Sequence, residues 1–239
     1  MPHIYIGTSG WHYPHWEGIF YPENLSQSRW LEHYVNFFDI TELNVTFYRL
    51  VKKKVFENWY KRTPKKFHFV VKGSRFITHI KQLKNCKEPL DLFIQNAKRL
   101  REKLAVILWQ LPPSYKKNLK ILETFCKLVK KTKISQAFEF RNQTWFDREV
   151  YNLLKEYNFC LCIAHSGRFP CVKEITSDSV YLRFHGGTSL YSGNYSDREL
   201  KDWARFIKQF KDKDIYAFFN NDAQGFAVKN ALRLKELLR

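Results

Sequence analysis

The sequence predicts an α/β fold, a single (β/α)8 TIM-like barrel with a parallel sheet that spans residues 1–239 as one domain. Eight strand-like apolar runs alternate with amphipathic stretches along the 239 residues, and no low-complexity linker separates them. A barrel of this type closes with eight parallel strands that alternate with helices. A single domain of about this length is usual for such a barrel. An open, doubly wound parallel sheet is the alternative.

The expected strands are residues 3–9, 40–48, 67–73, 104–112, 136–141, 159–165, 180–186 and 215–221. The expected helices, which show apolar residues at helical spacing, are residues 28–38, 53–62, 88–103, 119–131, 146–157, 196–210 and 227–239. Ser28, Asn118 and Ser196 are candidate N-caps. The stretch "SGRFPCVKEITSDS" is too short for a full helix, so we expect a shortened or missing helix between the sixth and seventh strands.

Composition points to a cytoplasmic protein without a membrane partner. No apolar run approaches the roughly 20 residues that a membrane span needs, and "MPHIYIGTSG" lacks the order of a secretory signal. The five cysteines include no pair at C-x-x-C spacing. Because Cys160 and Cys162 lie in an apolar strand pattern, we expect buried thiols and neither disulfides nor a zinc site.

The positive charge is concentrated in one third of the chain. The formal net charge is +18, and residues Arg49 to Lys133 hold 24 Lys and Arg against 5 Asp and Glu, a net of +19. If this segment folds as neighbouring elements, it forms a basic face that attracts phosphates. The alternative is a lysine-rich, solvated surface without a partner.

Alternation along the strands identifies side chains that face the barrel interior. Strand residues alternate faces, and the outer face of a barrel packs on helices and is apolar. Leu43, Val45 and Phe47 therefore face outward, which leaves Glu42, Asn44 and Thr46 inside. The same rule places Lys72, Glu139, Arg141, Arg183 and His185 inside. His165 shares parity with apolar neighbours, but its position at the end of its strand places it near the mouth.

These interior polar residues lie in the carboxyl halves of their strands, where barrel enzymes keep their chemistry. Glu42 and Glu139 are candidates for general base and acid, with His185 as a proton shuttle and His165 as a further catalytic candidate. Lys72, Arg141 and Arg183 predict an anionic ligand, since guanidinium groups bind phosphate or carboxylate in bidentate fashion. A purely structural network of ion pairs is the alternative. The two glutamates and two histidines are also possible metal ligands, but the three cations argue against a metal, and we assign neither a metal nor a cofactor.

Loops at the expected mouth supply further candidates. "FHGGTS" and "NNDAQGFAVKN" follow the seventh and eighth strands, where barrels often bind phosphate. The opening stretch "GTSGWHYPHWEGIFYP" places aromatic rings in the first loop, with Trp16, Phe20 and Tyr21 packed against the first helix. Tyr48, Trp145, Tyr191 and Tyr195 are further aromatic residues expected at the mouth. The predicted substrate-binding residues are Thr8, Ser9, Trp11, Tyr13, Asn44, Lys72, Arg141, Arg183, Gly186, Tyr191, Asn220 and Asn221.

Several stretches together resemble the YecE-like family, also called domain of unknown function 72, whose members are TIM-barrel proteins. They include "GTSGWHYPHWEGIFYP", "ELNVTFYRL", "LWQLPPS", "FEFRNQTW", "LRFHGG" and "FFNNDAQGFAVKNA". The resemblance implies a barrel over almost the whole chain and supplies no established reaction. Members usually carry an aspartate at the end of the sixth strand, where this chain has His165.

The sequence therefore favours an enzyme that acts on a phosphate-containing substrate, a nucleic acid or nucleotide, by hydrolytic or acid–base chemistry. One alternative is a nucleic-acid-binding protein without turnover, in which the basic third follows the backbone and aromatic residues stack on bases. Another is a glycosidase-like enzyme, since paired carboxylates and aromatic platforms also make sugar sites. The expected partner is a nucleic acid or a small anionic molecule.

Overall fold

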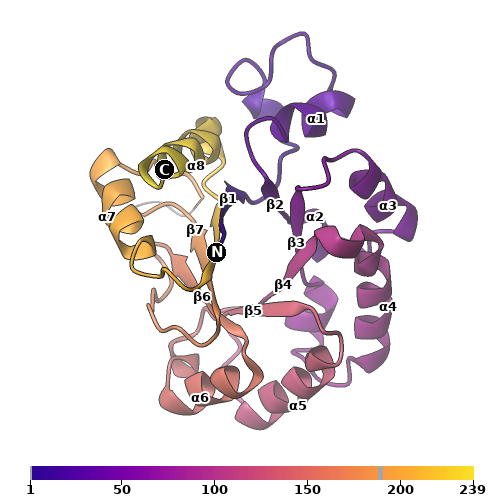
Figure 1. Cartoon of the computed structure of the whole chain (residues 1–239). Helices are drawn as coiled ribbons and strands as arrows, with labels where there is room; N and C mark the ends of the chain where they lie inside the picture. The colour runs from indigo at the N-terminus through magenta and orange to yellow at the C-terminus, as the bar shows by residue number, and fades with distance from the viewer. Residues whose placement is uncertain (1, 188–190) are drawn as a thin grey trace.

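A computed structural model of the chain describes residues 2–187 and 191–239. Its strands form one parallel sheet in the order β1-β8-β7-β6-β5-β4-β3-β2, which curls into a nearly closed barrel with helices around it (Figure 1). The predicted TIM-like barrel is therefore confirmed. The strands are β1 (Ile4–Thr8), β2 (Ile40–Leu43), β3 (His68–Lys72), β4 (Leu104–Gln110), β5 (Ser135–Glu139), β6 (Cys160–His165), β7 (Ser179–Phe184) and β8 (Asp214–Phe219).

The helices follow the expected order along the chain. They are α1 (Trp30–Tyr34), α2 (Val45–Tyr48), α3 (Lys53–Lys61), α4 (Lys87–Ala97), α5 (Leu119–Lys130), α6 (Arg148–Tyr157), α7 (Asp197–Ile207) and α8 (Phe226–Leu237). Asn118 and Ser196 cap α5 and α7 through their side chains, as predicted. The prediction for Ser28 is wrong, because this residue lies in a 3-10 turn before α1. None of the helices in residues 2–187 and 191–239 has the length and apolar character of a membrane span.

The connection between β6 and β7 contains no helix in the described residues 166–178, which confirms the expected gap in the outer ring. The second strand is shorter than predicted. It ends at Leu43, and Asn44 already has helical backbone angles (φ −75°, ψ −26°). The Thr46 hydroxyl donates to the Leu43 carbonyl oxygen at 2.7 Å and to the Lys72 carbonyl oxygen at 2.6 Å, a local bond that favours a turn over continued strand. Asn44 and Thr46 therefore do not project from β2 into the barrel.

Two apolar layers lie on the two faces of the sheet. Side chains such as Phe138 and Leu182 pack outward in the cluster shared with the helices. Val70, Leu108 and Cys162 belong to a second cluster inside the barrel. Cys160 and Cys162 are buried free thiols, as expected from the sequence. The barrel interior is thus filled by apolar side chains below the polar residues at its carboxyl end.

Side chains, and not a backbone ladder, join β1 to β2, which are the two ends of the described sheet. The Tyr34 hydroxyl accepts a hydrogen bond from the Thr8 backbone N–H (3.0 Å) and donates one to the Ile40 carbonyl oxygen (3.1 Å). The Thr41 hydroxyl donates to the Thr8 carbonyl oxygen at 3.2 Å. A Cβ atom at Gly7 would lie 2.3 Å from the Ile40 carbonyl oxygen, so the strands approach too closely for any other residue there.

Candidate functional site

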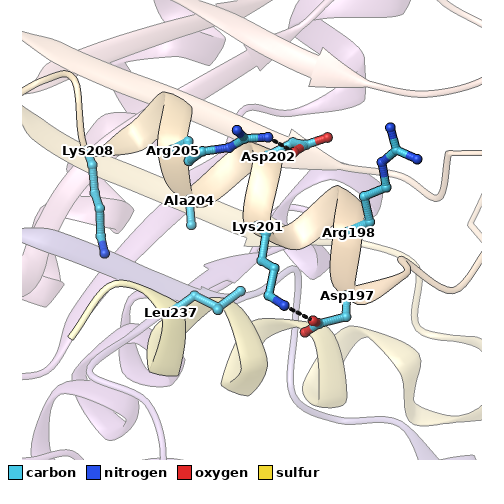
Figure 2. A pocket seen from close by; sticks show the side chains of 8 residues that line it. All are labelled: Asp197, Arg198, Lys201, Asp202, Ala204, Arg205, Lys208 and Leu237. Atoms are coloured by element: carbon cyan, nitrogen blue, oxygen red, sulfur yellow. Dashed lines mark hydrogen bonds and ion pairs between the residues drawn. The ribbon is translucent and has the colours of Figure 1, made fainter.

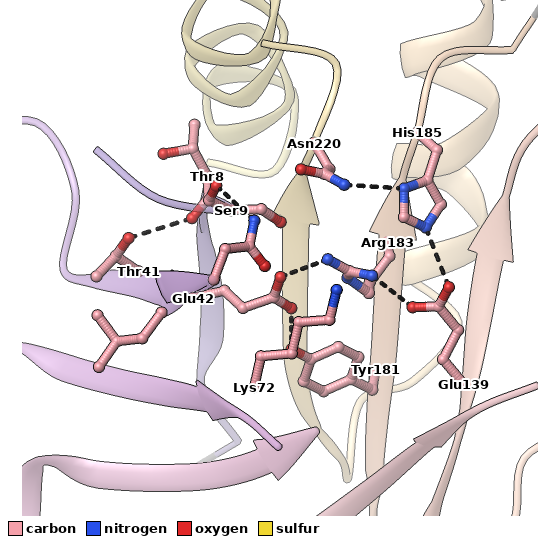
Figure 3. Close-up of polar contacts among 12 residues, drawn as sticks. Thr8, Ser9, Thr41, Glu42, Lys72, Glu139, Tyr181, Arg183, His185 and Asn220 are labelled. Carbon is pink, nitrogen blue, oxygen red and sulfur yellow. Dashed lines mark hydrogen bonds and ion pairs between the residues drawn. The ribbon is translucent and has the colours of Figure 1, made fainter. Parts of the chain in front are cut away.

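A buried guanidinium lies at the centre of the polar cluster. Arg183, the fifth residue of β7, has no exposed surface, and neither have Glu42 on β2 and Glu139 on β5. Its Nη1 donates to Glu139 Oε2 at 2.5 Å, and its Nη2 donates to Glu42 Oε1 at 2.6 Å (Figure 3). Three strands are therefore joined through one side chain, as the alternation of strand residues predicts.

Neighbouring groups complete the hydrogen bonding of the two carboxylates. The Tyr181 hydroxyl donates to Glu42 Oε2 at 2.6 Å, and Arg141 Nε donates to Glu139 Oε1 at 2.7 Å. Burial on its own would raise the pKa of Glu139, but the guanidinium groups of Arg141 and Arg183 outweigh it and hold that pKa well below its usual range. Glu139 is therefore a carboxylate near neutral pH and is not a proton donor.

His185 lies beside this network with one ring nitrogen unengaged. The Asn220 side-chain amide donates to His185 Nδ1 at 3.1 Å, so the neutral ring carries its hydrogen on Nε2. Nε2 lies 3.5 Å from Glu139 Oε1, which is longer than a normal hydrogen bond, and it has no hydrogen-bond partner among the described residues. Burial lowers the pKa of His185 to about 4. The ring is thus a neutral N–H donor directed at the centre of the cluster.

Lys72, at the end of β3, contributes a second titratable group. Its side chain extends between Glu42 and Arg183 toward the carboxyl end of the strands (Figure 3). The Nζ atom lies 4.2 Å from the centre of the Phe47 ring. Burial, followed by the charge of Arg183, lowers the pKa of Lys72 to about 7. The amine is therefore only partly protonated near neutral pH.

Arg141 connects the cluster to the mouth. Its Nη1 donates to the Tyr191 hydroxyl at 3.2 Å, and the guanidinium lies 4.6 Å from the centre of the Phe169 ring. Its side chain is 9% exposed, whereas that of Arg183 is 0% exposed. Because both terminal nitrogens of Arg183 bind glutamates, Arg141 and not Arg183 is the guanidinium that can reach a ligand.

His165 does not join the cluster. Its Nδ1 lies 2.9 Å from the Tyr195 hydroxyl, and its ring packs edge-on against Trp203 of α7 at 5.3 Å. Its ring therefore faces the outer helices, in agreement with its strand parity. His165 does end β6 beside Gly187 of the loop after β7, near the mouth as expected, but its predicted catalytic place within the cluster does not fit this orientation. The four proposed metal ligands do not come together, and no group of three or more His, Cys, Asp or Glu side chains at metal-binding spacing occurs in residues 2–187 and 191–239.

Thr8, Ser9 and Asn44 lie at the junction of β1 and β2 and are engaged mainly with the backbone. The Thr8 hydroxyl donates to the Gly10 carbonyl oxygen at 2.6 Å. The Asn44 amide donates to the Ser9 carbonyl oxygen at 3.0 Å, and the Ser9 hydroxyl has no partner among the described residues. Of the three side chains, Ser9 thus keeps an unused hydroxyl.

The aromatic residues of the opening stretch divide into a packed group and a groove. Trp16 and Tyr21 are buried, and Tyr21 stacks on Trp30 with ring centres 4.5 Å apart, as expected for a loop packed against the first helix. Trp11 and Tyr13 line a surface groove with Asn44, Tyr48 and Arg49 among others. Trp11 is only 9% exposed and contacts Trp59 edge-on at 5.7 Å, so it forms the wall of the groove more than a free stacking surface.

Of the four other aromatic residues expected at the mouth, two are buried. Trp145 stacks on Phe140 and donates from Nε1 to the Tyr115 carbonyl oxygen at 2.6 Å. Tyr195 is 3% exposed. Tyr48 and Tyr191 are exposed, with 76% and 37% of their surface accessible. All four residues lie after the carboxyl ends of strands, as expected, but only Tyr48 and Tyr191 expose their rings.

Gly186 and Asn221 support the loops around the site. Gly186 has a positive φ of 91°, and its N–H donates to the Tyr195 hydroxyl at 3.2 Å. The Asn221 amide donates to the Gly193 carbonyl oxygen at 2.8 Å and to Asn230 Oδ1 at 2.9 Å. Asn221 thus connects α8 with the loop that precedes α7. Its neighbour Asn220 contacts the site through His185.

Two residues of the cluster, Tyr181 and Phe47, were not predicted from the sequence. Tyr181 lies two positions before Arg183 and therefore shares its face, so the same alternation could have identified it. Phe47 was assigned to the outer side of a strand, but it lies in α2 and packs under the Lys72 amine. No signal in the sequence indicates that β2 turns into a helix at Asn44.

The basic segment is divided between the two ends of the barrel. Lys52 to Lys54 lie at the start of α3, which follows β2, and so they lie toward the carboxyl ends of the strands. Lys65 and Lys66 directly precede β3 at the opposite end, where Lys66 lies 3.4 Å from Asp39. The lysines of this segment therefore do not share one side of the barrel mouth.

A second surface hollow lies away from the cluster, between α7 and the end of α8 (Figure 2). Four of its six charged side chains form two ion pairs, since Lys201 lies 2.8 Å from Asp197 and Arg205 contacts Asp202. Because these ion pairs are exposed and mutually satisfied, this hollow is a solvated helix face and not a candidate site.

The parallel barrel and the polar cluster at the carboxyl ends of its strands define a TIM-barrel protein with a candidate site at the end where such proteins usually carry it. The family model described as "Protein of unknown function DUF72" matches residues 5–239, and the chain belongs to this family. The resemblance to the YecE-like family is thereby confirmed.

Three known proteins illustrate the relationship. The chain is 30% identical over 271 residues to UPF0759 protein YunF of Bacillus subtilis (strain 168), with 98% of this chain and 94% of the relative covered. The crystal structure of a DUF72 family protein of Thermotoga maritima MSB8 is 31% identical, covers 99% of both chains and has a TM-score of 0.88. D-psicose 3-epimerase of Clostridium cellulolyticum H10, solved with D-tagatose, is 11% identical, covers 100% of this chain and 98% of that chain, and has a TM-score of 0.57. The likeness to the epimerase concerns the fold alone.

Proposed function

We propose that this protein is an enzyme that takes a phosphate-containing substrate at the carboxyl end of the barrel and acts on it by acid–base chemistry. The main support is the pairing of Lys72, whose pKa of about 7 leaves it in both protonation states near neutral pH, with the neutral Nε2–H of His185. A catalytic acid or base works best when its pKa lies near the operating pH. Lys72 is the proton acceptor in this proposal, and the neutral Nε2–H of His185 stabilises negative charge on a substrate oxygen through a hydrogen bond.

Glu42 and Glu139 take a different role from the one expected from the sequence. Both carboxylates bind Arg183, and the pKa of Glu139 is lowered, so they offset the charge of the guanidinium groups instead of exchanging protons. A glycosidase with a carboxylic acid as proton donor needs that pKa raised. The lowered pKa of Glu139 therefore argues against the glycosidase alternative.

The phosphate-binding role is tested with Arg141. Arg141→Gln is expected to weaken the binding of adenosine 5′-monophosphate about tenfold or more, because a hydrogen bond to a charged group contributes about 1.5–3 kcal/mol. Isothermal titration calorimetry measures the affinity, and Arg205→Gln, which changes an exposed guanidinium on α7, is the control with unchanged affinity. Equal affinities of both variants, or no binding to the unmodified protein, would contradict the proposal.

Nucleic-acid binding without turnover is the second candidate, and an exposed groove favours it. Tyr48 and Arg49 also line a second groove with Arg75, Phe76 and Ile80, next to the groove that contains Trp11. Phe76 is 45% exposed. Exposed aromatic rings beside guanidinium groups suit a single strand, whose bases stack while its phosphates bind the cations.

The salt dependence of binding tests this candidate. Arg49→Glu with Arg75→Glu is expected to make the slope of log affinity against log salt for a single-stranded oligonucleotide shallower by about 1.4, since each phosphate contact contributes about 0.7. Lys65→Glu with Lys66→Glu, at the opposite end of the barrel, should leave the slope unchanged. Tyr48→Ala should weaken binding by about 1–3 kcal/mol without changing the slope. Filter binding across a salt series measures all three, and equal slopes for the two charge reversals would remove this candidate.

A further inference from the structure

Two buried lysines in this protein have very different surroundings. Lys103 is 3% exposed, and its Nζ donates to the Tyr60 and Thr63 carbonyl oxygens, both at 2.7 Å, and to the Thr63 hydroxyl at 3.0 Å. Lys72 is 7% exposed, and none of the described residues accepts a hydrogen bond from its Nζ. Burying an amine without acceptors is unfavourable, so Lys72 has no structural explanation of the kind that accounts for Lys103.

The groups around the Lys72 amine come from several elements. The guanidinium groups of Arg183 on β7 and Arg141 after β5 disfavour a positive charge on the amine. The carboxylates of Glu139 and Glu42 favour it. His79, in the π-helix η3 (Phe76–Ile80), also lies near enough for the charge of Lys72 to affect its ring. The two carboxylates already bind Arg183, so neither is free to hold the ammonium.

We propose that Lys72 is a nucleophile that forms an imine with the aldehyde or ketone carbonyl of a phosphate-bearing substrate. The proposal rests on the proposed function and adds the functional group on which the enzyme acts. The amine lies at the carboxyl end of β3, with the N–H donor of His185 on the same side of the barrel (Figure 3). Arg141 lies next to Glu139 at the mouth, where its guanidinium can take the phosphate.

The covalent step balances without a further reagent. The lone pair of the neutral amine attacks the carbonyl carbon, a C–N bond forms and the carbonyl π bond breaks, while the neutral His185 Nε2–H stabilises the oxygen by a hydrogen bond. One proton passes from the nitrogen to this oxygen through solvent water, which gives a neutral carbinolamine. The nitrogen then loses its second proton, and the hydroxyl group takes up one proton and leaves as one water molecule, which breaks the C–O bond and gives the neutral imine. Nothing is oxidised or reduced.

The surroundings of Lys72 favour this step over an exposed lysine. With a pKa of about 7, roughly half of the amine is neutral at pH 7. An exposed lysine, with a pKa near 10.4, is neutral in only about one molecule in two thousand at that pH.

Reductive trapping tests the proposal. The full chain is incubated with sodium cyanoborohydride and one of three probes: glyceraldehyde 3-phosphate, a single-stranded oligonucleotide with an aldehydic abasic site, or glyceraldehyde without phosphate. Peptide mass spectrometry then locates the adducts. We expect Lys72 to be modified at pH 7 about 1,000-fold faster than exposed lysines by one of the phosphate-bearing probes, with a rate that rises through a midpoint near pH 7. Lys103 should stay unmodified.

The variants and probes separate the possible outcomes. Lys72→Arg keeps a positive charge and should abolish the adduct, while its circular dichroism melting curve shows that it is folded. The phosphate-bearing probe that reacts faster identifies the substrate as a small sugar phosphate or a strand. The proposal is overturned if none of the three probes modifies Lys72 faster than it modifies exposed lysines. If adenosine 5′-monophosphate binds but Lys72 is not trapped, the imine alone fails; equal trapping of glyceraldehyde with and without phosphate rejects the phosphate requirement.

Discussion

Arg183→Met is expected to lower the free energy of unfolding by about 3–5 kcal/mol, because it leaves two buried carboxylates without their shared counter-charge. Both Glu42 and Glu139 are fully buried, and neither can offset the negative charge of the other. Urea denaturation at pH 7 measures the loss, and an unchanged m-value would show that the folded state keeps its compactness. Arg205→Met, which removes an exposed guanidinium paired with Asp202, is the control and should change stability by less than about 0.5 kcal/mol.

The difference between Arg183→Met and the unmodified protein should depend on pH. The lowered pKa of Glu139 means that its carboxylate stabilises the folded state above the pKa of glutamate in the unfolded chain, near 4.3, and that this contribution is lost as pH falls through the folded value. The difference in unfolding free energy should therefore narrow below about pH 4.3. A loss of stability that stays constant down to the lowest pH at which the protein is folded would instead indicate lost packing around the arginine.

Lys72→Met is expected to raise the free energy of unfolding by about 1–4 kcal/mol, whereas Lys103→Met is expected to lower it by about 1–3 kcal/mol. The methionine at position 72 removes a largely buried amine that donates no hydrogen bond to any of the described residues. The methionine at position 103 leaves two carbonyl oxygens and a hydroxyl without their donor. Urea denaturation at pH 7 measures the change in the free energy of unfolding for each variant. A change of the same sign in both would contradict the difference proposed between these two lysines.

The pH dependence of the Lys72→Met effect follows from the lowered pKa. Between about pH 7 and 10.4 the unfolded chain binds more protons at this lysine than the folded protein does, so the stability of the unmodified protein rises with pH in that window. The methionine variant lacks this contribution. Its advantage should thus be largest below pH 7 and should disappear near pH 10. Retaining a destabilising lysine is what a functional site predicts, since such sites often reduce stability.

The strand periodicity was sufficient to predict the centre of the site. Glu42, Glu139, Arg183 and His185 alternate with apolar residues that pack on helices, and a closed barrel brings such positions together at one end. Lys72, Arg141 and Arg183 were expected to bind an anionic ligand, but Arg183 binds two glutamates and Lys72 is only partly protonated. Pairing and burial depend on the third dimension, so composition alone cannot give the net charge of a pocket.

Other predictions failed where local interactions override the pattern. A strand was expected through Asn44, but the hydroxyl of Thr46 bonds to carbonyl oxygens on β2 and β3 and favours a helical turn. His165 was expected to join the catalytic residues from its position at the end of its strand, yet its parity already directed it toward Trp203. Trp11 of the opening stretch was expected to contact the substrate, but it is only 9% exposed, and Tyr48 is the more exposed ring.

The junction of β1 and β2 has a consequence for biosynthesis. The backbone partner of β1 is β8, more than 200 residues later, whereas side chains such as Thr41 and Asn44 connect the junction of β1 with β2. During translation the first strand thus leaves the ribosome long before its backbone partner has been made. Strands β2 to β7 can assemble stepwise with neighbours already made, whereas the N-terminal strand must wait for the last strand. On a ribosome stalled before residue 214, the sheet would therefore end at β7, and β1 would have no strand to pair with.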